Sequence, residues 1–335
     1  MAKARAIVKR RKAVRNIRKI TKTMQMIATA KFQKSLKRAV GTKPYTLKVR
    51  ELVNDLAEAL GDIRHPLLRL PGPDDRTGRI ALIVITSNRG LAGAYNGSIL
   101  RTAAQFIRQR QAAGQTVDLY VSGKKGISYF NFQRQPITQR YEQFADLPRF
   151  ADVQEIADHF MARFTAGAID SLHVAYMNFL SASTQRPDVL QILPLAGVRQ
   201  AAEHLAQQAD EMHAADEIVG DRPVHHAAAI AASGLPLARQ RGLTPLHAEI
   251  TYDFSPSASA LLDELLPLTV KSALFQCFLD AVTSENVARM VAMKSATDNA
   301  DKMVKALTMR YNRARQSQIT TELSEIMGGV EAMKS

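Results

Sequence analysis

The sequence contains one cysteine and no tryptophan, and its first 50 residues include no acidic side chain. The single cysteine, Cys277, excludes an intrachain disulfide and any zinc site built from several cysteines. Aromatic residues make up only 6% of the 335 residues. A core of Ala, Met, Ile and Leu, as in packed helices, is therefore favoured over a β-sandwich core.

Targeting and membrane-spanning segments are also missing from the pattern. No apolar segment follows the charged N-terminus, so no secretory signal is predicted. The longest uncharged stretches, such as residues 223–238, are shorter than the roughly 20 apolar residues of a spanning helix. We therefore expect a protein that is soluble or peripheral to a membrane.

Motifs for catalysis or cofactor binding are likewise absent. There is no P-loop, and the glycines of the loop 90–97 have the wrong spacing for a dinucleotide fingerprint, so a structural turn is predicted there. Residues 122–126 resemble a short basic turn, and the histidines lack the spacing of a zinc site. Cys277 is predicted to be packed and inert on an apolar helix face. We predict no catalytic residue, no metal and no cofactor, with a dinucleotide enzyme using residues 70–195 as one alternative.

The charge is strongly segregated along the chain. Residues 1–50 contain 17 Lys and Arg, whereas the remainder holds 28 basic and 31 acidic residues. Like charges four residues apart destabilise a helix by about 0.2–0.5 kcal/mol per pair. The segment 261–335, with nine basic and nine acidic residues, is not expected to neutralise them. The predicted basic face consists of Arg11, Arg15, Arg18 and Lys22. Its acidic partner is expected to be another molecule: a nucleic acid, a membrane surface or a protein cavity with acidic loops.

Two long helices are predicted at the ends of the chain. Residues 1–40 contain no Gly or Pro, Pro44 predicts a kink or break, and 45–60 form a second helical stretch. Residues 268–327 also lack Gly and Pro and predict a rod of about 90 Å. The apolar stripe of the first helix is Val14, Ile17, Ile20, Met24 and Ile27. That of the second helix is Leu279, Val282, Met290, Met293, Ala300, Met303, Leu307, Tyr311, Ala314, Leu323, Ile326 and Val330. Stripes of this length predict an antiparallel coiled coil.

The middle of the chain predicts a Rossmann-like α/β domain. Apolar, β-branched runs at 80–86, 117–122 and 172–179 alternate with helical stretches at 98–112 and 152–166. The fold class is therefore α/β, with a long antiparallel coiled coil and a central domain. The predicted divisions are 1–60 (first helix), 75–196 (central domain), 197–248 (an Ala- and His-rich insertion, helical over 199–215), 249–257 (last strand and loop) and 258–333 (second helix).

Four motifs together resemble the gamma subunit of F-type ATP synthases, the central stalk of that enzyme. Residues 19–31 (KITKTMQMIATAK) are similar to its N-terminal signature, and 284–299 (SENVARMVAMKSATDN) to its C-terminal signature. Residues 311–329 continue the C-terminal match, and 87–96 (SNRGLAGAYN) resemble the central motif. About four-fifths of the chain takes part in this resemblance.

The resemblance implies a non-catalytic rotor, with ATP made or hydrolysed on the beta subunits. The coiled coil would lie inside a ring of three alpha and three beta subunits. The central domain would sit on the membrane ring of c subunits beside the epsilon subunit. The acidic partner would then be the beta-subunit loops, not nucleic acid, and the nucleic-acid binder is the alternative function. The location implied is peripheral, on the cytoplasmic face of the bacterial plasma membrane.

The family's contact residues can be carried over by position. Lys22, Met24, Arg315, Gln316, Thr320 and Glu322 match positions that grip the beta-subunit loops. Tyr252 and Ser255 fall in the foot loop that touches the rotor ring.

Departures from the family pattern fall in three places. Ser255 stands where an acid is common, Asn88 replaces an Asp, and 92–94 (Ala-Gly-Ala) replace Cys-Gly-Gly. The insertion 197–248 lies where plastid relatives carry a regulatory dithiol, and its lack of cysteine excludes thiol control. We hypothesise that the insertion modulates rotation or packs against the foot.

Overall fold

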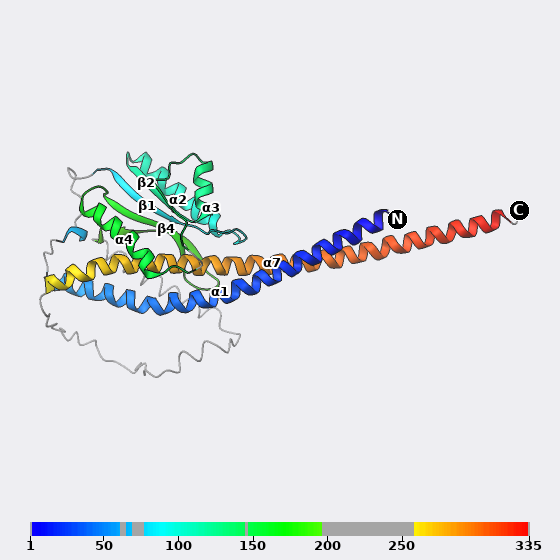
Figure 1. Cartoon of the computed structure of the whole chain (residues 1–335), viewed down its shortest axis with the longest axis horizontal. Helices are drawn as coiled ribbons and strands as arrows, with labels where there is room; N and C mark the ends of the chain where they lie inside the picture. The colour runs from blue at the N-terminus through cyan, green and yellow to red at the C-terminus, as the bar shows by residue number, and fades with distance from the viewer. Residues whose placement is uncertain (1, 61–64, 69–76, 145–146, 196–257, 334–335) are drawn as a thin grey trace, which may run out of the picture.

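Two long helices run side by side through the whole molecule (Figure 1). The computed structural model describes residues 2–60, 65–68, 77–144, 147–195 and 258–333. Helix α1 (Ala2–Leu60) has 59 residues and helix α7 (Ala258–Ala332) has 75. They are antiparallel, so both termini project from the same end, and α7 extends past the start of α1 (Figure 1). We call the part of the pair that projects beyond the α/β domain the shaft.

Helix α1 continues through Pro44, where the sequence predicted a kink or break. A proline inside a helix loses one backbone hydrogen bond and costs about 3 kcal/mol. Here the Pro44 ring is exposed, while Ala39 before it and Thr46 and Val49 after it are buried. Packing on both sides of the proline therefore holds the helix together. Pro267 is accommodated inside α7 in the same way.

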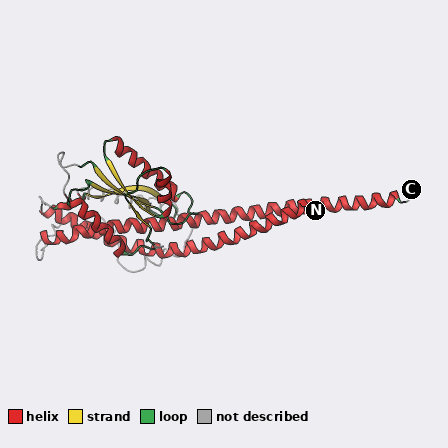
Figure 2. Cartoon of the chain, turned by 45° about the horizontal axis from the view of Figure 1, so that its top comes forward, coloured by secondary structure: helices red, strands yellow, loops and turns green. Residues whose placement is uncertain are grey.

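The α/β domain is built on one five-stranded sheet (Figure 2). Its order is β3-β2-β1-β4-β5, with bounds β1 (Arg79–Ile85), β2 (Thr116–Ser122), β3 (Gln139–Tyr141), β4 (Ser171–Phe179) and β5 (Gln185–Leu193). The first four strands are parallel, and β5 pairs antiparallel with β4. The apolar run of β1 is buried because helices cover both faces of a parallel sheet.

The helices form a layer on each side of the sheet. Helices α2 (Tyr95–Ala112) and α3 (Lys124–Phe132) pack on the face that carries Leu82 and Val84. Helix α4 (Phe150–Thr165) and the first part of α7 pack on the face that carries Ala81 and Ile83, together with the short helix η1 (Pro66–Leu68). This is the predicted fold class, a Rossmann-like domain joined to an antiparallel helix pair.

The sequence interpretation missed four elements of the domain: η1, α3, β3 and β5. The predicted basic turn at 122–126 is the start of α3, whose Ile127 and Phe130 are buried against the sheet. Its Gly126 leaves room for Thr86 and Val121, which a Cβ would approach to 2.7 Å. Strand β5 was also missed, because Pro187 and a mixture of polar residues hide its alternation. The insertion and the predicted strand at 249–254 lie outside the described residues.

The seam between α1 and α7 uses only Val14 of the apolar stripe predicted for α1. The α1 residues buried along the seam are Val14, Thr21, Ala28, Ser35, Ala39, Thr46 and Val49. Ile17, Ile20, Met24 and Ile27 are instead 53%, 57%, 37% and 51% exposed. On α7 the buried seam residues are Met293, Thr297, Ala300 and Leu307. Met293, Ala300 and Leu307 belong to the stripe predicted for this helix, whereas Thr297 does not. Met303 was predicted in the stripe but is exposed. Helix α7 packs against the polar face of α1 because Thr297 and Asp301 of α7 pair there with Thr21 and Arg18.

Within the described residues, α7 also contains a stretch with the length and hydropathy of a membrane-spanning helix, inside Leu261–Met327. Of that stretch, 61% is buried in the protein. Burial in the domain core, on the face that holds Leu266, Leu274 and Phe278, accounts for its apolar character.

Candidate interaction surface of the shaft

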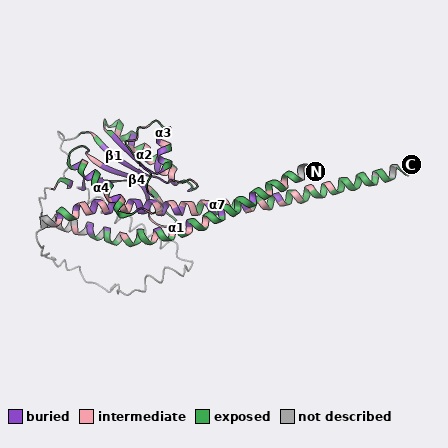
Figure 3. Ribbon diagram, viewed as in Figure 1, coloured by how far each residue is buried: buried purple, intermediate pink, exposed green. Residues whose placement is uncertain are grey.

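Helix α1 carries an exposed apolar stripe on a face that the seam with α7 does not bury. We define the α1 stripe as Ile17, Ile20, Met24 and Ile27. Along the shaft most of α1 is exposed, whereas the buried residues gather where α7 passes the sheet (Figure 3). Each half-exposed Ile or Met leaves apolar area in water, on the order of 1 kcal/mol of unused burial. A surface of this kind is typical of a binding site.

The predicted basic face divides into two pairs. The Arg11 guanidinium lies 5.0 Å from the centre of the Tyr311 ring on α7, and Arg18 forms an ion pair with Asp301 of α7. Arg15 and Lys22 are exposed, on the face of α1 away from the α1 stripe. The expectation that α7 neutralises none of these cations is therefore wrong for Arg18. Residues 11 and 18 are seven apart and border the seam, so their long side chains reach the partner helix.

The other predicted contact residues lie at the far end of α7. Arg315, Gln316, Thr320 and Glu322 are all exposed there. The Thr320 hydroxyl donates to the Gln316 carbonyl oxygen at 3.0 Å, and Gln318 donates to the Glu322 carboxylate at 2.8 Å. Their apolar neighbours are exposed as well, because α1 does not extend so far: Ile319, Leu323, Ile326, Met327 and Val330.

The structure therefore places the predicted contacts at two levels of the shaft. Thr21, next to Lys22, is opposite Thr297 on α7. Arg315 is 18 residues further along α7, which corresponds to about 27 Å. The two predicted foot residues, Tyr252 and Ser255, lie outside the described residues.

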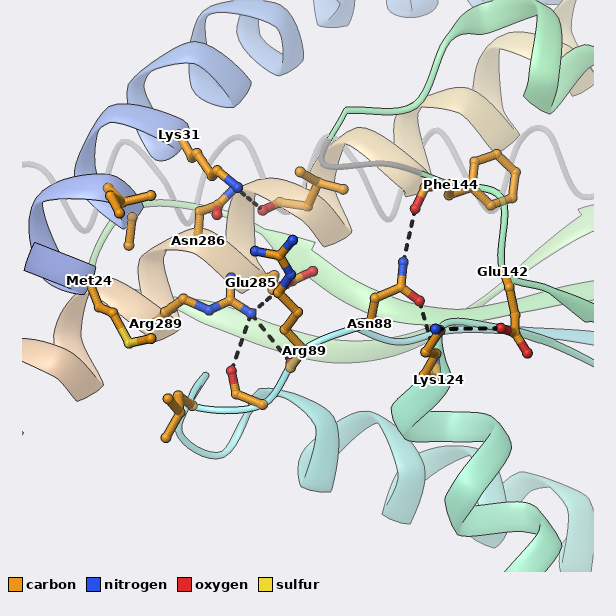
Figure 4. A pocket seen from close by; sticks show the side chains of 15 residues that line it. Met24, Lys31, Asn88, Arg89, Lys124, Glu142, Phe144, Glu285, Asn286 and Arg289 are labelled. Atoms are coloured by element: carbon orange, nitrogen blue, oxygen red, sulfur yellow. Dashed lines mark hydrogen bonds and ion pairs between the residues drawn. The ribbon is translucent and has the colours of Figure 1, made fainter. Parts of the chain in front are cut away.

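A groove of about 580 Å³ begins at Met24, where the shaft meets the domain (Figure 4). It is formed by α1, the loop after β1, the loop after β3, the start of α3, and α7. Its charged lining residues are Lys31, Arg89, Lys124, Arg289, Glu142 and Glu285. Four of these are basic and two acidic, so the groove continues the positive character of α1.

Arg289 ties α7 to the loop after β1. Its Nη2 donates to the Glu285 carboxylate at 2.6 Å and lies 3.4 and 3.5 Å from the carbonyl oxygens of Arg89 and Gly90. Sequence analysis gave Arg289 and Glu285 no role of their own. Their spacing of four residues on α7 was the available signal.

The glycine-containing loop is structural, as predicted. The amides of Lys124 and Lys125, at the start of α3, donate to Asn88 Oδ1 and to the Ser87 carbonyl oxygen, each at 3.1 Å. The Gly126 amide donates to Thr86 Oγ1 at 2.9 Å. The loop after β1 therefore occupies these backbone donors at the start of α3 itself.

Asn88 has a defined role in this loop. Besides accepting from Lys124, its Nδ2 donates to the Phe144 carbonyl oxygen at 2.9 Å. An aspartate, which is the common residue in the family pattern, has no donor for that carbonyl. The departure at this position thus changes a loop contact inside the domain.

Metal binding finds no support in the described part of the chain, which contains no group of three His, Cys, Asp or Glu side chains that could hold an ion. Cys277 is buried in the domain core, as predicted.

Comparison with known proteins adds an independent observation. The family profile described as ATP synthase matches residues 3–333. The ATP synthase gamma chain of Rhodopirellula baltica is 40% identical over 334 residues, which cover 100% of each chain. That of Nocardioides sp. is 36% identical and covers 96% of this chain and 93% of its own.

Solved structures show the same fold. A chain of the Euglena gracilis mitochondrial ATP synthase (OSCP/F1/c-ring, rotational state 3) has a TM-score of 0.59 at 16% identity, covering 99% of this chain and 95% of its own. A chain of the Tetrahymena thermophila central stalk/c-ring has a TM-score of 0.51 at 19% identity, covering 83% and 99%.

Proposed function

Because this chain belongs to the ATP synthase gamma-chain family, we propose that it is the central-stalk rotor subunit of a proton-translocating F-type ATP synthase. It couples rotation of a membrane ring of c subunits to ATP synthesis or hydrolysis on the beta subunits, and has no catalytic residue of its own. Its partners are three alpha subunits, three beta subunits, the epsilon subunit and the c ring. It is a peripheral protein on the cytoplasmic face of the bacterial plasma membrane.

The observation that best supports the proposal is that the shaft exposes apolar and basic side chains, as a binding surface does. The α1 stripe is exposed on one face of α1, Arg15 and Lys22 are exposed on another face, and the end of α7 exposes apolar residues around Arg315. A ring of subunits with apolar and acidic loops would bury both levels. A stiff, asymmetric rod inside such a ring contacts one site at a time, and so imposes different conformations on equal sites.

We assign the contact roles accordingly. Lys22 and Met24 would engage the beta-subunit loops at the level nearer the domain, and Arg315, Gln316, Thr320 and Glu322 at the level about 27 Å further along. Tyr252 and Ser255 would touch the rotor ring. The insertion 197–248 would modulate rotation or pack against the foot. If it modulates rotation, deleting residues 200–245 should change the rate or inhibition of ATP hydrolysis by the assembled complex.

The nucleic-acid alternative explains less. Arg11 and Arg18 are already engaged by α7, and the exposed Arg15 and Lys22 lie on another face of α1 than the isoleucines. A phosphate backbone would pair with the cations but would leave the apolar stripe in water.

The test is co-expression with the alpha and beta subunits. The wild-type chain should form a stoichiometric complex with ATPase activity. The double variant Ile17→Ser/Ile20→Ser should weaken assembly or coupled ATPase activity at least tenfold, because two buried isoleucines would be lost. Phe132→Ser is the matched control, since Phe132 is 84% exposed on the domain and should be neutral. Absence of a complex with the wild-type chain would refute the proposal.

A further inference from the structure

On its α1 side the seam of the shaft is mostly small or polar, where a long coiled coil usually has large apolar residues. Between residues 11 and 28 the α1 side of the seam holds Arg11, Val14, Arg18, Thr21 and Ala28. The α7 side holds Met293, Thr297, Ala300, Asp301 and Leu307, and Leu307 packs with Val14. Because α1 contributes few large apolar knobs, apolar packing alone specifies the relative position of the two helices weakly.

Two polar contacts join the helices within this weak stretch. The Thr297 hydroxyl donates to Thr21 Oγ1 at 2.8 Å, in a buried position. One turn away, Arg18 forms its ion pair with Asp301, their side chains 48% and 43% exposed. The Arg11–Tyr311 contact lies one heptad further along α1. All three contacts belong to the same antiparallel register.

A slip by one heptad would break this set in either direction. Such a slip moves one helix by about 10 Å along the other. In one direction Arg18 would face Lys294, a like charge, and Thr21 would face Met290. In the other direction Arg18 would face Thr308 and Thr21 would face Val304. The polar contacts therefore discriminate against both neighbouring registers, as buried polar residues do in coiled coils.

Register matters for the proposed rotor because its two contact levels are on different helices. Lys22 and Met24 are on α1, adjacent to Thr21, whereas the level around Arg315 is on α7. Beyond the domain the shaft consists of these two helices (Figure 1). Force applied to α1 near its N-terminal end passes to α7 through the seam, and this stretch is the part of the seam nearest to that end.

We propose that Thr21–Thr297 and Arg18–Asp301 form a register pin, which fixes α1 axially on α7 and holds the two contact levels at their working separation. This proposal rests on the proposed function for its consequence, but not for the register itself. The four side chains act as positioning residues, since they set where the contact residues stand.

The register can be measured directly in the full-length chain. Spin labels at Lys12→Cys on α1 and Ser295→Cys on α7, both exposed positions, lie roughly 20 Å apart along the shaft. Buried Cys277 is replaced by Ala in this background. A slip of one heptad would change the label distance by several ångströms in pulsed electron resonance.

Charge reversal supplies the perturbation. Arg18→Asp or Asp301→Arg alone should shift or broaden the distance distribution, and the swapped double variant should restore it. Lys271→Glu is the matched control, because Lys271 pairs with Asp158 at 2.8 Å inside the domain and should leave the shaft distance unchanged. Unaltered distances in both single variants, or no restoration by the swap, would overturn the ion-pair part of the pin.

The hydroxyl pair is tested with Thr21→Val/Thr297→Val, which keeps side-chain shape. The distribution should broaden while helix content is retained; an unchanged distribution would remove these residues from the pin. In the assembled complex, the single charge reversals should lower protons pumped per ATP, and the swap should recover them. If distances behave as expected but no complex forms with alpha and beta subunits, the proposed function fails and the pin stands.

Discussion

His173 provides a quantitative test of the domain's packing. It lies on β4, buried among α2 side chains, with the Phe106 ring centroid at 4.9 Å and Ser171 Oγ at 3.1 Å from its Nε2. Burial, reinforced by the positive charge of Arg110, lowers the pKa of His173 from 6.5 to about 4. The imidazole is therefore neutral in the folded protein near pH 7.

The direction of the pH effect follows from this shift. As the pH falls below 6.5 the unfolded chain binds a proton at residue 173 before the folded chain does. Stability is thus lost between pH 6.5 and about 4, and the loss levels off below that range. Relative to neutral pH, the linkage relation lowers the free energy of unfolding by about 2 kcal/mol at pH 5 and by about 3 kcal/mol at pH 4.

The assay is urea unfolding of the full-length chain at pH 7.5, 6.0, 5.0 and 4.0. The variant His173→Gln has no titrating group at this position. Its free energy of unfolding should therefore fall between pH 7.5 and 5.0 by about 2 kcal/mol less than that of the wild type. His159→Gln is the control, since His159 is exposed on α4 and should keep the wild-type slope. Equal slopes for wild type and His173→Gln would show that the burial argument is wrong.

Three further outcomes are expected. Gly123→Ala should destabilise the chain by more than about 3 kcal/mol in thermal unfolding, because its φ is 95° and an added Cβ would collide with the backbone carbonyl of Thr86. The control Gly114→Ala also has a positive φ, 76°, but meets open space, so it should cost about 1 kcal/mol. Asn88→Asp should cost about 1–3 kcal/mol in urea unfolding at pH 7.5, because a loop carbonyl loses its donor; a neutral result would contradict the assigned hydrogen bond. Arg315→Ala should reduce ATPase activity of the assembled complex several-fold, whereas Arg313→Ala, exposed on the same part of α7, should change it little; equal effects would argue against a specific contact.

Much of the architecture followed from local patterns. The β1 run of apolar, β-branched residues predicted a buried parallel strand, and the lack of Gly and Pro over 268–327 predicted the long helix. Strand β5 and helix α3 could not be found this way. Strand β5 forms by pairing with β4, and α3 by packing on β2, so their stability comes from neighbours that a local pattern does not contain.

For a similar reason, some residues of the candidate site were predicted from the sequence and others were not. The family resemblance supplied Met24 and Arg315, and both are exposed on the shaft, but their contacts with other subunits stay a prediction. Thr297, Asp301 and Arg289 act through partners on distant segments, and periodicity on one helix does not indicate them.

The sequence by itself determined that two long helices exist, that residues 1–50 are basic without acids, and that a parallel sheet lies between the helices in the chain. These are properties of composition and period along a single segment. The tertiary structure alone decided which face of α1 is buried. Two faces of α1 have residues spaced three and four apart, as a helix seam requires: one face is apolar, and the other is small and polar. Helix α7 buries the polar face through Thr297, which is 276 residues from Thr21, and through Asp301, and leaves the isoleucines exposed.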